Sequence, residues 1–541
     1  MRHVRPTRRE FIQLATAAAF SMSLGCISNK FVDKLAEKGT KPEDYPVVVI
    51  GSGIGGLASA LYVSKAGFPV TLLEQHSVPG GYATAFQRGD FNFDVSLHWF
   101  TLQEELYKEL GLDGKVERIP IDMTWRTISK NRDVTVPIMG PEQHVDFVCK
   151  AFPAEKDGIR KFYDFCFEVY DELMRFSKKA ETGYIFIPFM PFQFPKMWSM
   201  REVSFADVLK KYVKDPMTQS SLARICSIWG LPPSQSSGLM ATMLVASMVK
   251  DKSYYFKSRS QDLTNALVEV IEDHKGKVIL GKNVTRILTE KDRVTGVQTE
   301  DGAIYPAKIV VSNANAPDTF GKFLSGNEKA KKHMEKLSRY SPSISSFIVW
   351  LGLKGELRGK VPAHGITIES GYDIETDFKN FQACDADKSP LGVAMYDNYY
   401  KGYSKPGTST LTILMMSGYE PWRKFEKDYF AGNKREYNRE KERVARILIK
   451  RIEKAVIPGL SRKIKVMEAA TPLTNMRYTK NPGGAIYGYP PSMNNSYTTR
   501  VKNSTPIKGL YLSSGWGNYW GSYPGGIMNG RDVYRLIMKE M

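Results

Sequence analysis

Residues 47–75 read VVVIGSGIGGLASALYVSKAGFPVTLLEQ. The apolar run 47–50 is dense enough to form a buried parallel strand. A glycine-rich turn follows, then a helix that we expect to end near Gly67, and then a second strand over 69–73 that ends at Glu74. Strand, glycine turn, helix, strand and acid is the order of a dinucleotide-binding unit.

The turn has the spacing G-x-G-x-x-G, with glycines at Gly51, Gly53 and Gly56. In such a unit the first glycine permits the tight turn, the second lets a pyrophosphate approach the backbone, and the third lets the helix pack closely. The helix N-terminus offers N–H groups to the phosphates. Glu74 can accept hydrogen bonds from ribose hydroxyls and would repel a 2′-phosphate, which disfavours NADP.

A second glycine pair follows this acid, Gly80 and Gly81 in EQHSVPGGYATAF, and FNFDVSLHWF comes next at 91–100. These motifs resemble the N-terminal signature of the FAD-dependent family of phytoene desaturases, carotenoid isomerases and retinol saturases, of which amine oxidases are broader relatives. In that family the glycine pair approaches the flavin end of FAD. One position departs from the family pattern, because Ser96 stands where a glycine is usual.

Two later segments resemble the same family, in the same order. Residues 262–315 alternate short strands with turn signals and contain a VVSNA run at 310–314 near their end, and the resemblance implies that the backbone of Val284 meets the adenine. The C-terminal segment has a strand at 510–512, a glycine-rich turn and a helix expected from about Ile527. The family often has an aspartate in this turn, whereas this chain has Gly515.

The motifs and the resemblance together predict an FAD site. Its expected cofactor-binding residues are Gly51, Ser52, Gly53, Gly55, Gly56, Glu74, Gly80, Gly81, Val284, Gly515, Pro524, Gly525, Gly526 and Ile527. Weak catalytic candidates are His98, which could equally be a structural histidine, and Tyr487 and Trp520, which either wall a dry substrate pocket or fill the core beside the cofactor. No metal site is predicted, because no cluster has interpretable ligand spacing.

The expected fold class is α/β, with a Rossmann-like FAD-binding domain built from discontinuous segments and an inserted α+β substrate-binding domain. At 541 residues the chain exceeds one compact core. The predicted FAD-binding segments are 46–115, 262–340 and 465–541. Residues 116–261 and 341–464 are assigned to the substrate or cap domain.

Several patterns in the cap segments predict secondary structure. Residues 161–176 have the apolar spacing of a core helix, residues 344–355 and 408–418 are apolar enough for buried strands, and 433–457 form a charged amphipathic helix. The run YIFIPFMPFQFPKMW at 184–198 contains three prolines, which exclude a continuous helix. It could dip into a lipid surface as a substrate entrance, or pack as a loop under the cap.

Residues 1–26, MRHVRPTRREFIQLATAAAFSMSLGC, resemble a twin-arginine export signal, with Arg8 and Arg9 before a short apolar stretch. The final Ser-Leu-Gly-Cys resembles a lipoprotein cleavage box and makes Cys26 a candidate for lipidation. Residues 27–45 are polar and form a predicted tether. The expected location is therefore the periplasm or cell envelope; a cytosolic protein with a basic N-terminus is the alternative.

Charge and cysteine content limit the other options. The formal net charge is +19, and without a basic block or nucleic-acid motif it predicts a diffuse basic surface, with no nucleic-acid partner and a membrane surface as a possible one. Five cysteines form no C-x-x-C pair, and the four after Cys26 are expected to be buried apolar residues.

These observations predict an exported FAD-dependent oxidoreductase. The resemblance implies hydride transfer in a desaturation, saturation or isomerisation of an apolar polyene or isoprenoid-like substrate, with a quinone, oxygen or a carrier as electron partner. Two alternatives stay open: an amine oxidase-like enzyme with a polar substrate, and a lipid carrier that keeps the fold without turnover.

Overall fold

The computed structural model describes residues 41–541, apart from 97–98, 102–103, 122–124, 131, 137–138, 181–189, 362, 372 and 497–498. The predicted export signal with Cys26, most of the predicted tether, the candidate His98 and residues 184–189 of the proline-rich run therefore lie outside the described residues. Among the described helices, none combines the length and apolar character needed to cross a membrane.

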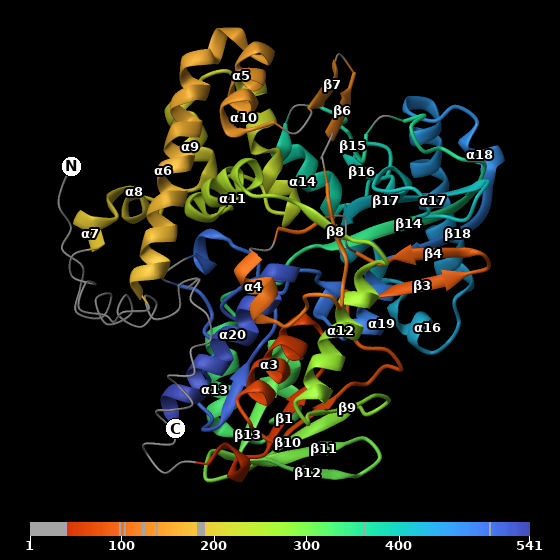
Figure 1. The fold of residues 1–541 in the computed structure, drawn as a ribbon. Helices are drawn as coiled ribbons and strands as arrows, with labels where there is room; N and C mark the ends of the chain where they lie inside the picture. The colour runs from red at the N-terminus through yellow and green to blue at the C-terminus, as the bar shows by residue number, and fades with distance from the viewer. Residues whose placement is uncertain are drawn as a thin grey trace.

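The lower half of the molecule in Figure 1 contains a five-stranded parallel sheet. Its strand order is β19 (Leu510–Leu512), β13 (Ile309–Ser312), β1 (Val47–Ile50), β2 (Val70–Leu73) and β9 (Lys277–Ile279). All four residues of β1 are buried, as expected for a strand with both faces covered. The chain thus brings together strands that are more than 400 residues apart in the sequence.

Side chains of β1 alternate between two cores. Val47 and Val49 pack on the side of α3 (Ile54–Lys65), which lies beside α12 (Ser260–Asp273) and α20 (Tyr523–Glu540). Val48 and Ile50 share the opposite core with a three-stranded antiparallel sheet. Its strands are β10 (Val284–Glu290), β11 (Arg293–Thr299) and β12 (Ile304–Pro306).

A seven-stranded mixed sheet forms one part of the upper half. Its strand order is β18 (Ile464–Ala470), β14 (Ser345–Lys354), β17 (Thr408–Ser417), β16 (Leu391–Ala394), β15 (Gly365–Ile368), β6 (Trp125–Ser129) and β7 (Arg132–Val136). The amphipathic helix α17 (Arg435–Ala455) buries Val444, Leu448 and Ile452 in the same core as the apolar residues of β14 and β17.

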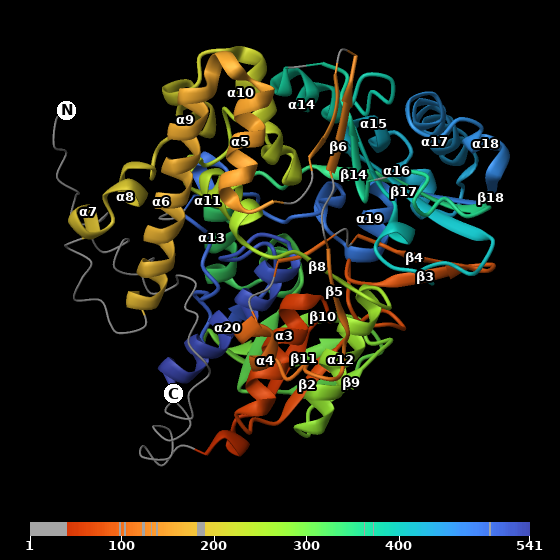
Figure 2. The same ribbon diagram turned by 45° about the horizontal axis from the view of Figure 1, so that its top comes forward.

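Helices form the other part of the upper half, and Figure 2 shows them grouped beside the mixed sheet. They are α5 (Pro141–Ala151), α6 (Lys156–Ala180), α7 (Met190–Gln193), α8 (Pro195–Ser199), α9 (Phe205–Tyr212), α10 (Pro216–Ala223) and α11 (Gly238–Lys250). The aromatic stripe of α6 is core, since Phe162 and Phe176 are fully buried.

The remaining elements connect these parts. They are β3 (Ala85–Arg88), β4 (Phe91–Asp94), α4 (Glu104–Glu109), β5 (Arg118–Pro120), β8 (Tyr254–Phe256), α13 (Glu328–Leu337), α14 (Ile374–Gln382), α15 (Glu420–Arg423), α16 (Glu426–Phe430), α18 (Leu460–Lys463) and α19 (Pro472–Thr479), with short 3-10 or π turns η2 (Pro42–Asp44), η3 (Pro153–Glu155), η5 (Arg224–Ile228), η6 (Asp318–Phe323), η7 (Tyr396–Asn398), η8 (Pro482–Gly484) and η9 (Met493–Asn495).

The structure corrects two sequence predictions. The C-terminal helix does not begin near Ile527 but at Tyr523, because Ser522 caps it by accepting a hydrogen bond from the Gly525 N–H at 2.9 Å, and a proline is favourable in a first turn. The predicted boundary at 465 falls inside β18, which pairs with β14 of the mixed sheet and so does not belong with the lower half.

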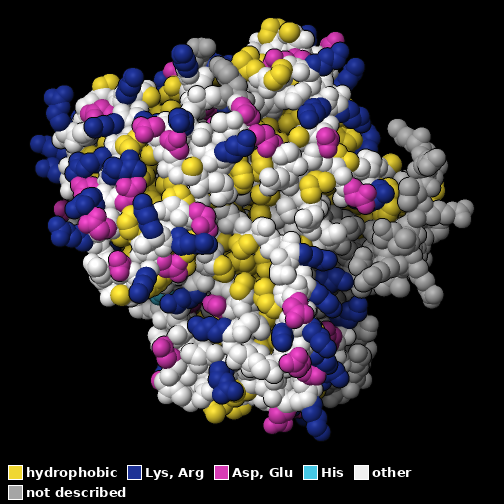
Figure 3. All heavy atoms as spheres, turned by 180° about the vertical axis from the view of Figure 1, so that it is seen from behind, with side chains coloured by type: hydrophobic (Ala, Val, Ile, Leu, Met, Phe, Trp, Pro, Cys, Tyr) yellow, Lys and Arg dark blue, Asp and Glu magenta, His cyan; other side chains and the backbone are white. Residues whose placement is uncertain are grey.

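Charge is spread over the surface rather than collected. On the face shown in Figure 3, Lys and Arg side chains lie over both halves with Asp and Glu among them, while hydrophobic side chains gather at the waist between the halves. The four cysteines of the described chain, Cys149, Cys166, Cys226 and Cys384, are free and buried, as predicted.

Candidate functional site

A cavity of about 1220 Å³ lies between the lower sheet and the cap. Pockets for single small ligands commonly measure roughly 300–1,000 Å³, so this cavity has room for a cofactor together with a substrate. One part is lined by the glycine turns and Glu74, and another by aromatic residues, methionines and leucines from both halves.

The turn between β1 and α3 forms the glycine-lined part. Gly51 has φ +88°, a conformation that a side chain would strain, so the first glycine is needed for the turn itself. Gly53 has an ordinary φ of −58°, but a Cβ there would lie 2.4 Å from Oδ1 of Asn313. Asn313 in turn donates a hydrogen bond from Nδ2 to the Ser513 carbonyl. Its side chain therefore ties the glycine turn to the end of β19.

Glu74 lies at the carboxyl end of β2 and is 5% exposed. Its Oε2 accepts hydrogen bonds from the Ser52 N–H at 2.7 Å and the Ser52 hydroxyl at 2.6 Å, and its Oε1 accepts one from the His76 N–H at 2.9 Å. These donors fix the carboxylate in place. A carboxylate has about four acceptor positions, so it keeps capacity for the hydroxyls of a ribose.

The second glycine pair lies against the first turn. Gly80 and Gly81 have φ of +126° and +61°, and the Gly80 N–H donates to the Ser52 carbonyl at 3.0 Å. A Cβ on Gly80 would come within 2.4 Å of the Ala83 carbonyl. Both positions therefore favour glycine for their backbone conformation, and Gly80 requires it for space as well.

Helices α3 and α20 approach each other through small residues. A Cβ on Gly530 would lie 2.5 Å from the Ala58 Cβ and 2.6 Å from the Ser59 nitrogen, and one on Gly526 would lie 2.8 Å from the side chain of Ile54. This close crossing places the N-terminal turns of both helices beside the same cavity, because Gly55 and Gly526 both line it.

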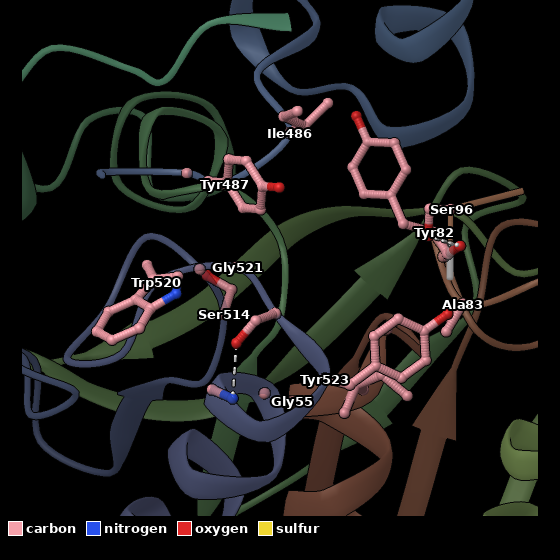
Figure 4. A pocket seen from close by; sticks show the side chains of 18 of the residues that line it. Gly55, Tyr82, Ala83, Ser96, Ile486, Tyr487, Ser514, Trp520, Gly521 and Tyr523 are labelled. Atoms are coloured by element: carbon pink, nitrogen blue, oxygen red, sulfur yellow. Dashed lines mark hydrogen bonds between the residues drawn. The ribbon is translucent and has the colours of Figure 1, made fainter. Parts of the chain in front are cut away.

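Aromatic side chains surround the central space of the cavity (Figure 4). Tyr487 and Trp520 lie on one side of this view, and Tyr82 and Tyr523 lie on the other. Burial raises the pKa of Tyr487 to about 12, so this phenol stays protonated at neutral pH. Trp229 also lines the cavity, with its ring edge-on to that of Trp520 at 6.2 Å between centroids.

Buried polar residues hold the loop at 514–521 that carries Trp520. Asn529 donates from Nδ2 to two loop carbonyls, at 3.0 and 2.8 Å. Asn503 accepts from a loop N–H at 2.9 Å and donates to Asp532 at 2.8 Å. Arg500 donates to further loop carbonyls, and burial lowers its pKa to about 10. The aromatic wall is therefore positioned by a network behind it.

Two observations indicate that these residues fit an FAD group. The N-terminus of α3 has no side-chain cap, unlike that of α20, so its first N–H groups are available to phosphate oxygens at the cavity wall. Glu74 lies beside the same turn with its position fixed. An FAD bound here would be held by the turn glycines at its phosphates and by Glu74 at a ribose.

Most predicted site residues come together in this one cavity. Those that line it are Gly51, Gly53, Gly55, Glu74, Gly80, Gly81, Val284, Tyr487, Gly515, Trp520, Pro524, Gly525 and Gly526. Ser52, Gly56 and Ile527 are placed behind the lining: Ser52 holds Glu74, a Cβ on Gly56 would lie 2.0 Å from the Gly51 carbonyl, and Ile527 is core.

Sequence reasoning missed three residues of the site: Asn313, Tyr82 and Trp229. Asn313 stands in the run at 310–314 that the resemblance marked, but the sequence does not show that its side chain contacts the glycine turn and the Ser513 carbonyl. Tyr82 directly follows the glycine pair. Trp229 had no sequence signal, because it reaches the cavity through packing of the cap.

The chain is similar to known proteins over most of its length. Residues 49–110 match the family described as NAD(P)-binding Rossmann-like domain. The chloroplastic prolycopene isomerase of Daucus carota is 29% identical over 494 residues, which cover 87% of this chain and 76% of that protein. The all-trans-retinol 13,14-reductase of Danio rerio is 25% identical over 504 residues, covering 87% and 82%.

Solved structures show the same fold at low identity. Cyclohexylamine oxidase from Brevibacterium oxydans aligns with a TM-score of 0.58 at 15% identity, over 92% of this chain and 99% of that structure. An oxidoreductase from Methanosarcina mazei aligns with a TM-score of 0.57 at 17% identity, over 91% and 100%. The predicted resemblance to carotenoid isomerases and retinol saturases, the α/β fold class with a Rossmann-like domain, and the prediction of an enzyme are confirmed.

Proposed function

We propose, from the relationship to isomerases and reductases of polyenes, that this chain is an FAD-dependent oxidoreductase acting on an apolar polyene or isoprenoid-like substrate. The observation that carries the proposal is the single cavity, in which glycine turns and Glu74 adjoin a wall of aromatic side chains. The relatives named above act on prolycopene and on all-trans-retinol, which are apolar polyenes.

FAD in this site would supply hydride transfer, which serves desaturation, saturation or, with reduced flavin, isomerisation. The chain's own residues would bind and orient the substrate. Tyr487, Trp520 and Trp229 offer flat apolar surfaces that exclude water from the reacting bond. Because Tyr487 remains protonated, it could donate a hydrogen bond but would not act as a base at neutral pH.

The proposal is tested by the purified protein's flavin spectrum and by mass spectrometry of the apolar molecules that co-purify with it. Tyr487→Leu and Trp520→Leu should each lower turnover, or the substrate-induced change in the flavin spectrum, while FAD content is kept. Trp422→Leu, at a tryptophan buried in the core of the mixed sheet, is the control for general destabilisation. Wild-type activity in both site variants would remove these residues from the site.

The two alternatives give different results in the same experiments. A lipid carrier would purify without flavin and with a bound apolar molecule. An amine oxidase-like enzyme would reduce its flavin with amines and not with polyenes. The electron partner, whether a quinone, oxygen or a carrier, would be identified by which acceptor reoxidises the reduced protein.

We further propose export through the twin-arginine route and attachment to a membrane surface. The support is the sequence of residues 1–26, and Phe192 on α7, which belongs to the proline-rich run and is 83% exposed. One lipid chain gives only marginal anchoring, so two contributions are expected. If the lipid on Cys26 dominates, Cys26→Ser should release the protein from membranes. If Cys26→Ser instead stays on membranes in high salt, the binding is assigned to the apolar run at 184–198, because salt screens charge attraction and not burial.

A further inference from the structure

One wall of the cavity is apolar apart from its end and from Ser247, whose hydroxyl donates to the Leu244 carbonyl. Helices α6 and α11 lie side by side and contribute Met174, Leu244 and Met248 to the lining. At the C-terminal end of α11, Tyr170 and Asp251 line the cavity as well. A polar pair at the end of an apolar wall is a site for the polar end of a long ligand.

The pair presents acceptors. Tyr170 Oη donates its one proton to the Asp251 carboxylate, at 2.9 Å from Oδ1 and 3.1 Å from Oδ2. The lone pairs of the phenol and the remaining ones of the carboxylate can only accept. A ligand group that fits here must donate a hydrogen bond.

Neighbouring charges favour a neutral donor over a cation. Lys250 lines the same part of the cavity, with Nζ 5.2 Å from the centre of the Tyr170 ring and 2.6 Å from Asp171. The exposed Lys252 lines it too. An ammonium group on the ligand would meet these like charges, whereas a hydroxyl would not.

We infer that Tyr170 and Asp251 bind a terminal hydroxyl, so that the substrate of this enzyme is a polyene or isoprenoid alcohol rather than a hydrocarbon. This inference rests on the proposed function and narrows its substrate class. Burial raises the pKa of Asp251, as its partly enclosed position requires, and a bound hydroxyl would supply the carboxylate with a further donor.

The test measures binding by fluorescence of the purified holoenzyme with two probes: all-trans-retinol and its methyl ether, in which a methyl group replaces the hydroxyl proton. Wild-type protein should bind retinol roughly tenfold more tightly than the ether, as a hydrogen bond to a charged acceptor implies. Asp251→Leu should bring retinol and the ether to within about twofold.

The control variant is Asp171→Asn, since Asp171 is exposed, pairs with Lys250 and is not part of the lining. It should leave the retinol-to-ether ratio unchanged. Equal binding of retinol and ether by the wild type, or an unchanged ratio in Asp251→Leu, overturns the inference. If β-carotene also binds as tightly as retinol, only the inference fails. If neither β-carotene nor any retinoid binds, the proposed function fails with it.

Discussion

Replacing Gly53 by alanine would separate two reasons for the glycine. The backbone allows any residue, because φ is −58°. The new Cβ would lie 2.4 Å from Oδ1 of Asn313, whose amide is held by the Ser513 carbonyl and so cannot swing freely. Overpacking of this kind costs about 1–3 kcal/mol, and displacing the Asn313 hydrogen bond costs about 1 kcal/mol.

The same Cβ would also stand where a pyrophosphate approaches the turn. If the overpacking cost of about 1–3 kcal/mol lowers the binding free energy of FAD, the affinity for FAD drops roughly 5- to 150-fold, because about 1.4 kcal/mol corresponds to each factor of ten. The double variant Gly53→Ala/Asn313→Ala removes the protein clash but leaves the phosphate clash. We therefore expect it to recover thermal stability without recovering FAD affinity.

The assay is titration of apoprotein with FAD, followed by flavin fluorescence, with the melting temperature measured in parallel. Gly371→Ala is the matched control, because a Cβ at Gly371 would have no heavy atom within 4 Å. Wild-type FAD affinity in Gly53→Ala would refute the steric reasoning. Full recovery of affinity in the double variant would show that Asn313, rather than the cofactor, requires the glycine.

Three further predictions concern helix packing, a buried carboxyl and export. Gly530→Val should lower the melting temperature and FAD content through overpacking against α3, whereas Gly321→Ala, with open space around it, should not; equal behaviour would contradict the packing argument. Burial raises the pKa of Asp532 to about 8, so the folded protein keeps a proton that the unfolded chain releases, and stability should fall as pH rises from about 4 to 8; Asp532→Asn should flatten that slope in melting curves, and parallel curves would remove the effect. Replacing Arg8 and Arg9 by lysine should leave the protein in the cytoplasm on fractionation, because a receptor reads the pair, and unchanged delivery would count against the signal.

The sequence predicted the lower half well because its signals are local. Apolar runs, a glycine spacing and an acid at the end of a strand all follow from the geometry of a single βαβ unit, and β1, β2 and Glu74 are where the pattern placed them. The start of α20 was wrong by four residues, since glycines at 525–526 suggested a turn. In the structure they allow a helix to cross α3 closely.

The rest of the site depends on contacts between distant segments. Asn313 meets glycines some 260 residues earlier and a carbonyl 200 residues later. Asp94, in the stretch at 91–100, holds the start of α12 by accepting hydrogen bonds from the Ser260 N–H at 2.9 Å and the Ser260 hydroxyl at 2.7 Å. Tyr170 and Asp251 meet only when α6 and α11 pack. Such pairs carry no periodic signal that one sequence could reveal.

The order of strands in the parallel sheet also determines when, during synthesis, the sheet and the cofactor site can be completed. β1 lies at the centre, but β19, at the far side of β13, leaves the ribosome about 460 residues after β1, and so roughly 25 to 90 seconds later at ordinary elongation rates. Until then β13 presents an open edge, and the carbonyl of Ser513 that secures Asn313 does not yet exist. The edge of β13 must therefore be protected from aggregation until residues 510–513 have been made, and FAD can meet a complete site only after that point.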